Sequence, residues 1–295
     1  MNTSKINFEN LEYNSTTLKN KTSIEYKFFN SRTKKTPIVF LYGLVCNNRH
    51  FEHQVNYFTQ KSYPVLILNY REHFGSKNPE GLAQCNFENI AEDIILLLDF
   101  LEIKKPHLIG HSMGVNVALE IALRDNSLVD KLILISGSPS RPQDYMFNTN
   151  LSYYIFPSVK KILNSNKKIG IKFWKNIHRV KLFRKMILDG GFNPNQVSDE
   201  FVKYYAQKIG ELGFDLFFKL VEEMKNHNLS SKLHLIENNT LIMGGDVDNI
   251  APIEGQVVFE KYLKNSSLYL IKDGSHVPQV DFHETVNEKI SHFIN

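Results

Sequence analysis

Short apolar runs of the kind that form buried β-strands alternate with segments of helical periodicity along most of this 295-residue chain. After an early strand at Ser23–Asn30, the apolar runs lie at Pro37–Tyr42, Pro64–Tyr70, His107–Gly110, Lys131–Ser136, Asn239–Met243 and Ser267–Ile271. The helical segments are Met113–Leu123, Ile253–Leu263, Asp281–Ile294 and a helix that Asn86 caps and Pro106 ends. This alternation predicts an α/β fold, with a mostly parallel central sheet flanked by helices.

One long interval breaks the alternation. About 100 residues separate Ser136 from Asn239, whereas a parallel crossover needs only about a dozen or more. Apolar residues recur through this interval at helical spacings, namely Phe173, Trp174, Leu182, Phe183, Phe201, Tyr204, Phe214, Leu216, Phe217 and Leu220. We therefore expect a helical cap at residues 140–235, inserted into a core made of residues 1–139 and 236–295.

The sequence Gly110-His-Ser112-Met-Gly114 matches G-x-S-x-G and lies between a predicted strand and a predicted helix. A serine at the apex of such a tight turn is forced toward strained backbone angles, and its neighbours two residues away must be small. Ser112 would also lie at a helix N-terminus, whose backbone N–H groups favour negative charge. The pattern predicts a nucleophile at Ser112, with an ordinary glycine-rich turn as the alternative.

A serine hydroxyl needs a base to accept its proton and an acid to orient that base. Asp246 and Asp248 follow the predicted strand at 239–243, and His276 follows the strand at 267–271. The chain order is therefore serine, aspartate, histidine, as expected when the nucleophile occupies a strand-to-helix turn. Each candidate lies just past the carboxyl end of a strand, where open α/β sheets place their sites.

Other residues compete for these roles. His283 and His292 fall in the final helical pattern, where packing or solvation accounts for them, and His111 lies inside the serine turn as a structural residue. His73 belongs to a loop, either as part of its architecture or as a substrate contact. An acid after the strand at 131–136 is disfavoured, because no carboxylate follows that strand before Asp144.

These motifs resemble those of the α/β-hydrolase superfamily, from about Ser23 to Asn295 except in the cap. The resemblance implies that the cap is inserted after the sixth core strand. It also favours Asp248 over Asp246, because the family's acid is the last residue of a G-x-x-D pattern. A stretch at 69–76, around His73, is similar to the family's D-x-R-G-x-G-x-S loop, although the first Asp and two glycines are not matched.

The resemblance further implies an oxyanion hole, which requires two backbone donors aimed at the carbonyl oxygen that gains charge. One donor would be the N–H of Met113, directly after the nucleophile. The other would come from the loop after Pro37–Tyr42, where Leu44 N–H is the candidate. The family usually has His-Gly in this loop, whereas this chain has Tyr42-Gly43, so a side chain that often braces the loop is replaced.

The function implied is acyl transfer, in which Ser112 forms an acyl-enzyme that water activated by His276 releases. Carboxylic esters are the expected substrates; thioesters, lactones and C–C bonds are alternatives, and so is a non-catalytic protein of this fold that binds a ligand. A serine rather than an aspartate nucleophile disfavours the dehalogenase and epoxide-hydrolase branches. No cofactor and no metal are expected, because the sequence has no Cys/His cluster and no His-Glu-x-x-His pattern.

The charge distribution is uneven although the formal net charge is only +4. Residues 145–187 contain ten Lys or Arg and no Asp or Glu, interleaved with apolar residues. A solvated basic face on the cap explains this pattern, and peripheral contact with anionic lipid or an acidic acyl substrate is the alternative. Nucleic acid is not expected, because no recognised binding motif accompanies the charge.

Cysteine content and the lack of long apolar runs indicate the cellular location of the protein. Two cysteines, Cys46 and Cys85, are too few for a disulfide framework. The first 17 residues have no apolar core of a secretory signal, and no run approaches the length of a membrane span. We expect a cytoplasmic location.

Overall fold

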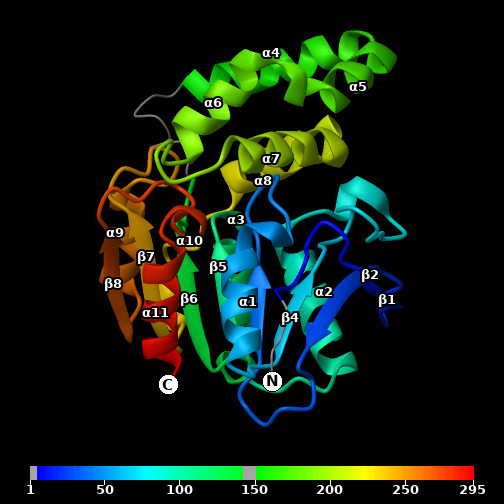
Figure 1. Ribbon diagram of the computed structural model, residues 1–295. Helices are drawn as coiled ribbons and strands as arrows, with labels where there is room; N and C mark the ends of the chain where they lie inside the picture. Colours follow the sequence, from blue (N-terminus) through cyan, green and yellow to red (C-terminus); the bar gives the residue numbers. More distant parts are fainter. Residues whose placement is uncertain (1–4, 142–150) are drawn as a thin grey trace.

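An eight-stranded sheet forms the centre of the computed structural model, which describes residues 5–141 and 151–295 (Figure 1). Its strand order is β1-β2-β4-β3-β5-β6-β7-β8. The first two strands, β1 (Asn14–Thr17) and β2 (Ser23–Phe29), are antiparallel to their neighbours. The other six are parallel, namely β3 (Ile38–Leu41), β4 (Val65–Leu68), β5 (His107–His111), β6 (Lys131–Ile135), β7 (Asn239–Gly245) and β8 (Ser266–Ile271).

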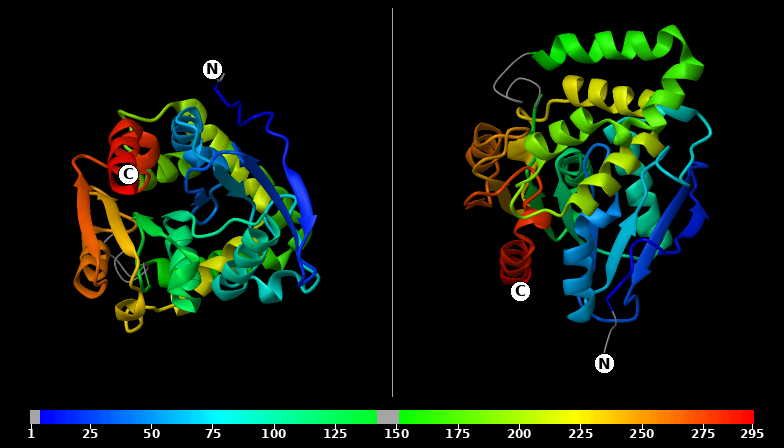
Figure 2. Two further views of the ribbon diagram at one scale, coloured as in Figure 1. Left: turned by 90° about the horizontal axis from the view of Figure 1, so that it is seen from below. Right: turned by 45° about the horizontal axis from the view of Figure 1, so that its top comes forward.

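Helices cover both faces of this sheet, as expected for a parallel sheet whose strands are apolar on both sides. The helices α1 (Glu52–Gln60) and α11 (His283–Ile294) pack side by side on one face, and α2 (Phe87–Phe100) and α3 (Met113–Arg124) on the other (Figure 2). Helix α9 (Ile253–Tyr262) packs against β7 and β8. Short 3₁₀ turns occur at Asn48–Phe51, Gly81–Gln84, Asn126–Leu128, Ile177–Arg179 and Leu233–Leu235.

The predicted helical insertion after the sixth strand is confirmed. Between β6 and β7 the structure has α4 (Leu151–Ser165), α5 (Lys167–Lys175), α6 (Lys181–Gly191), α7 (Asp199–Leu212) and α8 (Phe214–Asn226). Helices α7 and α8 lie between the sheet and the outer helices α4 and α5 (Figure 1). The division into a core and a cap at residues 140 and 235 stays a prediction, and the residues 142–150 within it lie outside the described residues.

Aromatic packing holds the layers of the insertion together. Trp174 of α5 is buried against Phe214, Phe217 and Phe218 of α8, with ring centroids 5.2–6.2 Å apart. Its indole N–H donates to the carbonyl of Ile209 in α7 over 3.0 Å, so the polar atom of this side chain is satisfied as well. One tryptophan thus joins α5 to both inner helices.

The predicted final helix at Asp281–Ile294 is observed as α11, which begins two residues later than predicted. A short helix that was not predicted, α10 (Pro278–Asp281), precedes it, and the two are separated at Phe282, whose φ and ψ are −124° and 45°. Proline occupies the first position of α10, where its fixed φ suits the first turn of a helix. The predicted cap at Asn86 is confirmed: its side chain accepts a hydrogen bond from the Asn89 N–H over 2.8 Å.

Candidate active site

Ser112 occupies a sharp turn between β5 and α3, with φ 53° and ψ −119°. Only a tightly packed turn holds a non-glycine residue at such angles. The glycines on either side leave no room for a side chain. A Cβ atom on Gly110 would lie 2.6 Å from the carbonyl oxygen of Gly114, and one on Gly114 would lie 2.0 Å from the carbonyl oxygen of Leu41. Both glycines therefore allow the chain to turn closely at Ser112, just past the carboxyl end of β5.

Three side chains from separate loops meet at this turn. The Ser112 Oγ lies 3.1 Å from Nε2 of His276, and Nδ1 of the same imidazole lies 2.9 Å from Oδ2 of Asp248. His276 follows β8, Asp248 follows β7, and the side chains of both are buried. The structure thus brings together the serine, histidine and aspartate that the sequence predicts as nucleophile, base and acid.

The carboxylate of Asp248 is fixed by its own turn. Its Oδ1 accepts hydrogen bonds from the backbone N–H groups of Ile250 and Ala251, each over 2.8 Å. Asp246, the other candidate acid, is exposed. The Asp248 loop and the His276 loop are also joined by backbone, because the Val247 N–H donates to the carbonyl of Gly274 over 3.1 Å. The two loops therefore form one support for the Asp248–His276 pair.

His111 supports the loop that contains His276. Its Nε2 lies 2.8 Å from the carbonyl oxygen of His276 and must carry a proton, since a carbonyl only accepts. Burial, together with the nearby His276, lowers the pKa of His111 well below its ordinary value. A neutral His111 therefore carries its single proton on Nε2 and anchors the main chain of His276.

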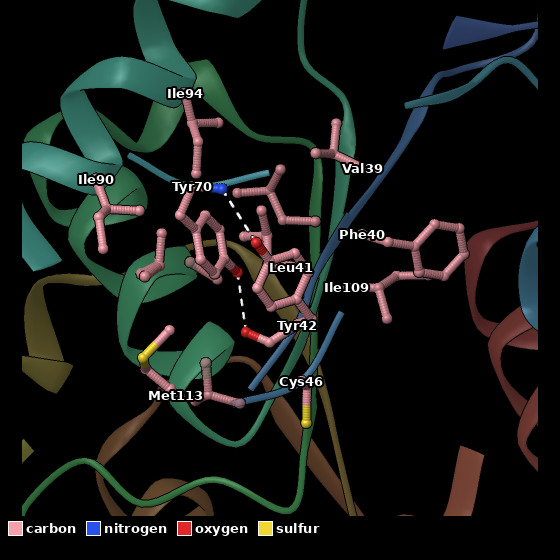
Figure 3. Packing of buried hydrophobic residues seen from close by; sticks show 14 of the residues in the cluster. Val39, Phe40, Leu41, Tyr42, Cys46, Tyr70, Ile90, Ile94, Ile109 and Met113 are labelled. Atoms are coloured by element: carbon pink, nitrogen blue, oxygen red, sulfur yellow. Dashed lines mark hydrogen bonds between the residues drawn. The ribbon is translucent and has the colours of Figure 1, made fainter. Parts of the chain in front are cut away.

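The loop after β3 approaches Ser112 closely. A Cβ atom on Gly43 would lie 2.9 Å from the Ser112 Cβ, so only glycine fits here. Two tyrosines fix this loop, as Figure 3 shows: the Tyr70 hydroxyl donates to the carbonyl of Tyr42 over 3.0 Å, and the Tyr70 N–H donates to the Tyr42 hydroxyl over 3.1 Å. Their rings are in contact, with centroids 4.3 Å apart. Tyr42, at the position where the resemblance implied a histidine, is therefore held by Tyr70 through both its hydroxyl and its carbonyl.

Comparison with known proteins identifies the family of this fold. A family model described as the alpha/beta hydrolase fold matches residues 36–282. The chain belongs to the α/β-hydrolase family. It is 23% identical over 278 residues to an uncharacterized hydrolase of Bacillus subtilis (strain 168), covering 92% of this chain and 94% of that protein.

This α/β-hydrolase family member is also similar to a lipase in sequence and to an esterase in structure. An sn-1-specific diacylglycerol lipase of Danio rerio is 33% identical over 134 residues, which is 45% of this chain and 40% of the lipase. A solved thermophilic esterase from Thermogutta terrifontis superimposes with a TM-score of 0.77 at 16% identity, covering 96% of this chain and 98% of the esterase. The structural match supports the fold.

A cavity of about 230 Å³ opens onto Ser112 and His276 in this α/β hydrolase. The core contributes the loop residues Leu44, Val45 and Cys46 to its wall. The insertion contributes mainly apolar side chains from α4 to α8, namely Phe156, Trp174, Phe183, Met186, Ile187, Tyr205, Ile209, Phe217, Val221 and Met224. A small apolar chamber with a few polar groups at one end suits a ligand that has an apolar part and one polar reacting centre.

A second carboxyl group lies near the site and was not predicted. Asp281 accepts a hydrogen bond from the Asn193 N–H over 3.1 Å and contacts the Ser275 hydroxyl, which also lies 3.1 Å from the carbonyl of Gly191. Burial raises the pKa of Asp281 to about 6. These contacts link the His276 loop to the segment after α6. Asp281 carried no signal in the sequence, because it coincided with the predicted start of a helix.

The remaining candidates lie away from this contact. His73 is buried with Nδ1 3.0 Å from the carbonyl of Arg71, and His283 stacks on His53 between α11 and α1. Asp144 lies outside the described residues. Among the residues with a described placement, no group of three or more His, Cys, Asp or Glu side chains could hold a metal ion. None of the helices at 5–141 and 151–295 combines the length and apolar character needed to span a bilayer.

Proposed function

We propose that this protein is a serine hydrolase that cleaves carboxylic esters or related acyl compounds through an acyl-enzyme on Ser112. The observation that carries the proposal is the chain of contacts from Asp248 through His276 to Ser112 at the end of an apolar cavity. Hydrogen bonding to a carboxylate keeps the proton of a neutral imidazole on Nδ1 and leaves Nε2 free to accept the serine proton. The three residues are therefore arranged as nucleophile, base and orienting acid.

The proposed reaction has two stages. Ser112 Oγ attacks the substrate carbonyl carbon while His276 Nε2 takes the hydroxyl proton, and the resulting oxyanion accepts hydrogen bonds from the N–H groups of Leu44 and Met113. The C–O bond to the leaving alcohol then breaks as His276 returns the proton to it. Water, deprotonated by His276, attacks the acyl-enzyme, and Ser112 regains its proton as the acid is released.

The cavity favours an apolar acyl group over a charged one. Desolvating an ionised group in a mainly apolar chamber is unfavourable, whereas burying methylene groups contributes about 0.8 kcal/mol each. The similarity of the chain to a diacylglycerol lipase and to an esterase supports the same class of substrate. We infer that the acyl chain lies among the side chains of α4 to α8 and that the ester carbonyl lies beside Ser112.

A substrate panel tests this proposal. Nitrophenyl esters of increasing acyl length, acyl thioesters and lactones are assayed with the wild-type protein and with Ser112→Ala. We expect turnover of at least the apolar oxygen esters and a loss of roughly 10³-fold or more in Ser112→Ala. Circular dichroism of both proteins shows whether the fold is retained. No turnover of any acyl compound by the folded wild-type protein would favour a ligand-binding role instead.

A further inference from the structure

The outer surface of the insertion combines positive charge with exposed apolar side chains. Helices α4 and α5 form the layer farthest from the sheet (Figures 1 and 2). Ile162, Ile169 and Phe173 are 70%, 64% and 51% exposed there. We name this surface the α4–α5 face and define it by the following residues: Lys161, Ile162, Lys168, Ile169, Lys172, Phe173 and Lys175.

The lysines of α5 lie on one side of the helix because of their spacing. Lys168, Lys172 and Lys175 recur at i, i+4 and i+7, opposite the buried residues Gly170 and Trp174. Packing of the buried side against α7 and α8 therefore points all three ammonium groups away from the protein. Helix α5 therefore buries one side in the protein and exposes a row of lysines on the other side. The exposed apolar side chains of Ile169 and Phe173 lie beside this row.

Acidic side chains do not neutralise this face. Residues 145–187 contain no Asp or Glu. Within the described part of the chain, the ion pairs of α5 and α6 are those of Lys167 with Asp215 and Lys185 with Asp189, and they leave Lys168, Lys172 and Lys175 without a carboxylate partner. Lysines this close together repel one another, so an anionic surface that contacts them all at once gains free energy.

We propose that the α4–α5 face docks onto an anionic lipid bilayer. The lysines would contact lipid headgroups, which attract each nearby Lys or Arg by about 1 kcal/mol. Ile162, Ile169 and Phe173 would enter the boundary between headgroups and acyl chains, as the apolar side chains of interfacial helices do. A purely electrostatic partner such as a nucleic acid backbone would leave the isoleucines in water, so the apolar residues favour the bilayer.

The same insertion forms much of the cavity wall. Met186 of α6 lines the cavity that reaches Ser112 and is also 62% exposed, and Leu182, one turn before it, is exposed too. The apolar wall of the cavity therefore continues to the protein surface on a helix that directly follows α5 in the chain. Docking itself does not depend on the proposed chemistry, because it is measured without turnover.

Vesicle flotation tests the proposal with the full-length protein. Vesicles of phosphatidylcholine alone are compared with equimolar phosphatidylcholine and phosphatidylserine, at low and at high salt. We expect binding only to the anionic vesicles, weakened by salt. The combined variant Lys168→Gln, Lys172→Gln, Lys175→Gln should bind on the order of 100-fold more weakly, from about 1 kcal/mol per lysine. Ile169→Ser with Phe173→Ser should also weaken binding, with all charges kept.

A matched control separates the face from total charge. Lys34, Lys61 and Lys104 are exposed and lie just before β3, β4 and β5, at the end of the sheet opposite the insertion. Their combined replacement by glutamine removes the same charge and should leave flotation within about twofold of the wild type, as expected for charges far from the contact. Failure of the wild type to bind anionic vesicles, or equal losses in the two triple variants, would overturn the proposal. Binding to duplex RNA but not to vesicles would overturn it as well.

Discussion

His111 holds the main chain of His276 through a hydrogen bond from its Nε2–H to the His276 carbonyl oxygen, 2.8 Å long. The residue before the proposed nucleophile thus positions the proposed base, so His111→Ala should misplace the imidazole. We expect kcat to fall by up to about 100-fold with a smaller change in KM, since misplacement of about 1 Å can cost that much. His111→Gln, whose amide can donate instead, should recover part of the loss. Equal kcat in His111→Ala and the wild type would contradict this role.

Asp248 should be required for the correct tautomer of His276. An asparagine at this position can donate to Nδ1, which would move the imidazole proton to Nε2 and block acceptance of the serine proton. We expect Asp248→Asn to lower kcat by roughly 10³- to 10⁴-fold, while Oδ1 keeps its bonds from Ile250 and Ala251. Asp246→Asn is the matched control, because Asp246 is exposed. Steady-state kinetics in which both variants lose the same activity would rule out this assignment.

The Tyr42–Tyr70 pair should stabilise both the fold and the loop at Gly43. Burial raises the pKa of Tyr70 well above its ordinary value, so its hydroxyl stays a donor. Tyr70→Phe leaves the buried carbonyl of Tyr42 unpaired, and we expect the free energy of unfolding to fall by about 1–3 kcal/mol and kcat to fall with it. Tyr63→Phe, which loses a bond to Asn295 far from the site, should leave kcat unchanged. Urea unfolding and ester turnover measure the two effects.

Asp281 should make stability depend on pH. Burial raises its pKa from 3.8 to about 6, so the folded protein binds this proton more tightly than the unfolded chain does. The resulting stabilisation is fully present below about pH 4 and is lost as the pH rises through about 6; it amounts to at most about 3 kcal/mol. Asp281→Asn removes the titrating group. Urea unfolding at several pH values should show that the free energy of unfolding of the wild type falls relative to that of the variant between pH 4 and 6. Parallel pH profiles of the two proteins would refute the assignment.

The core of the sheet was predictable because burial on both faces leaves an unmistakable pattern. Residues 38–41, 65–68 and 107–111 are all buried, as their apolar runs indicated. Strand β1 was not predicted, since its sequence Asn-Ser-Thr-Thr is polar and it lies at an edge. Helix α1 was missed for a related reason: two of its four buried residues, Gln54 and Asn56, are polar.

The candidate site was predictable only in part. Ser112 and His276 follow from local motifs, but spacing alone left both Asp246 and Asp248 open, and the resemblance to a family decided between them. Contacts between distant parts of the chain left no local signal. Tyr42 meets Tyr70 across 28 residues and Asn193 meets Asp281 across 88, so neither pair could be read before the fold was known.

Covalent labelling tests the central proposal, that Ser112 is the nucleophile, most directly. The native protein is treated with a fluorophosphonate probe, and the modified peptide is identified by tandem mass spectrometry. We expect one adduct on Ser112, no adduct in Ser112→Ala, and slower labelling in Asp248→Asn. Absence of labelling in the folded wild-type protein, or an adduct that persists in Ser112→Ala, would contradict the proposal.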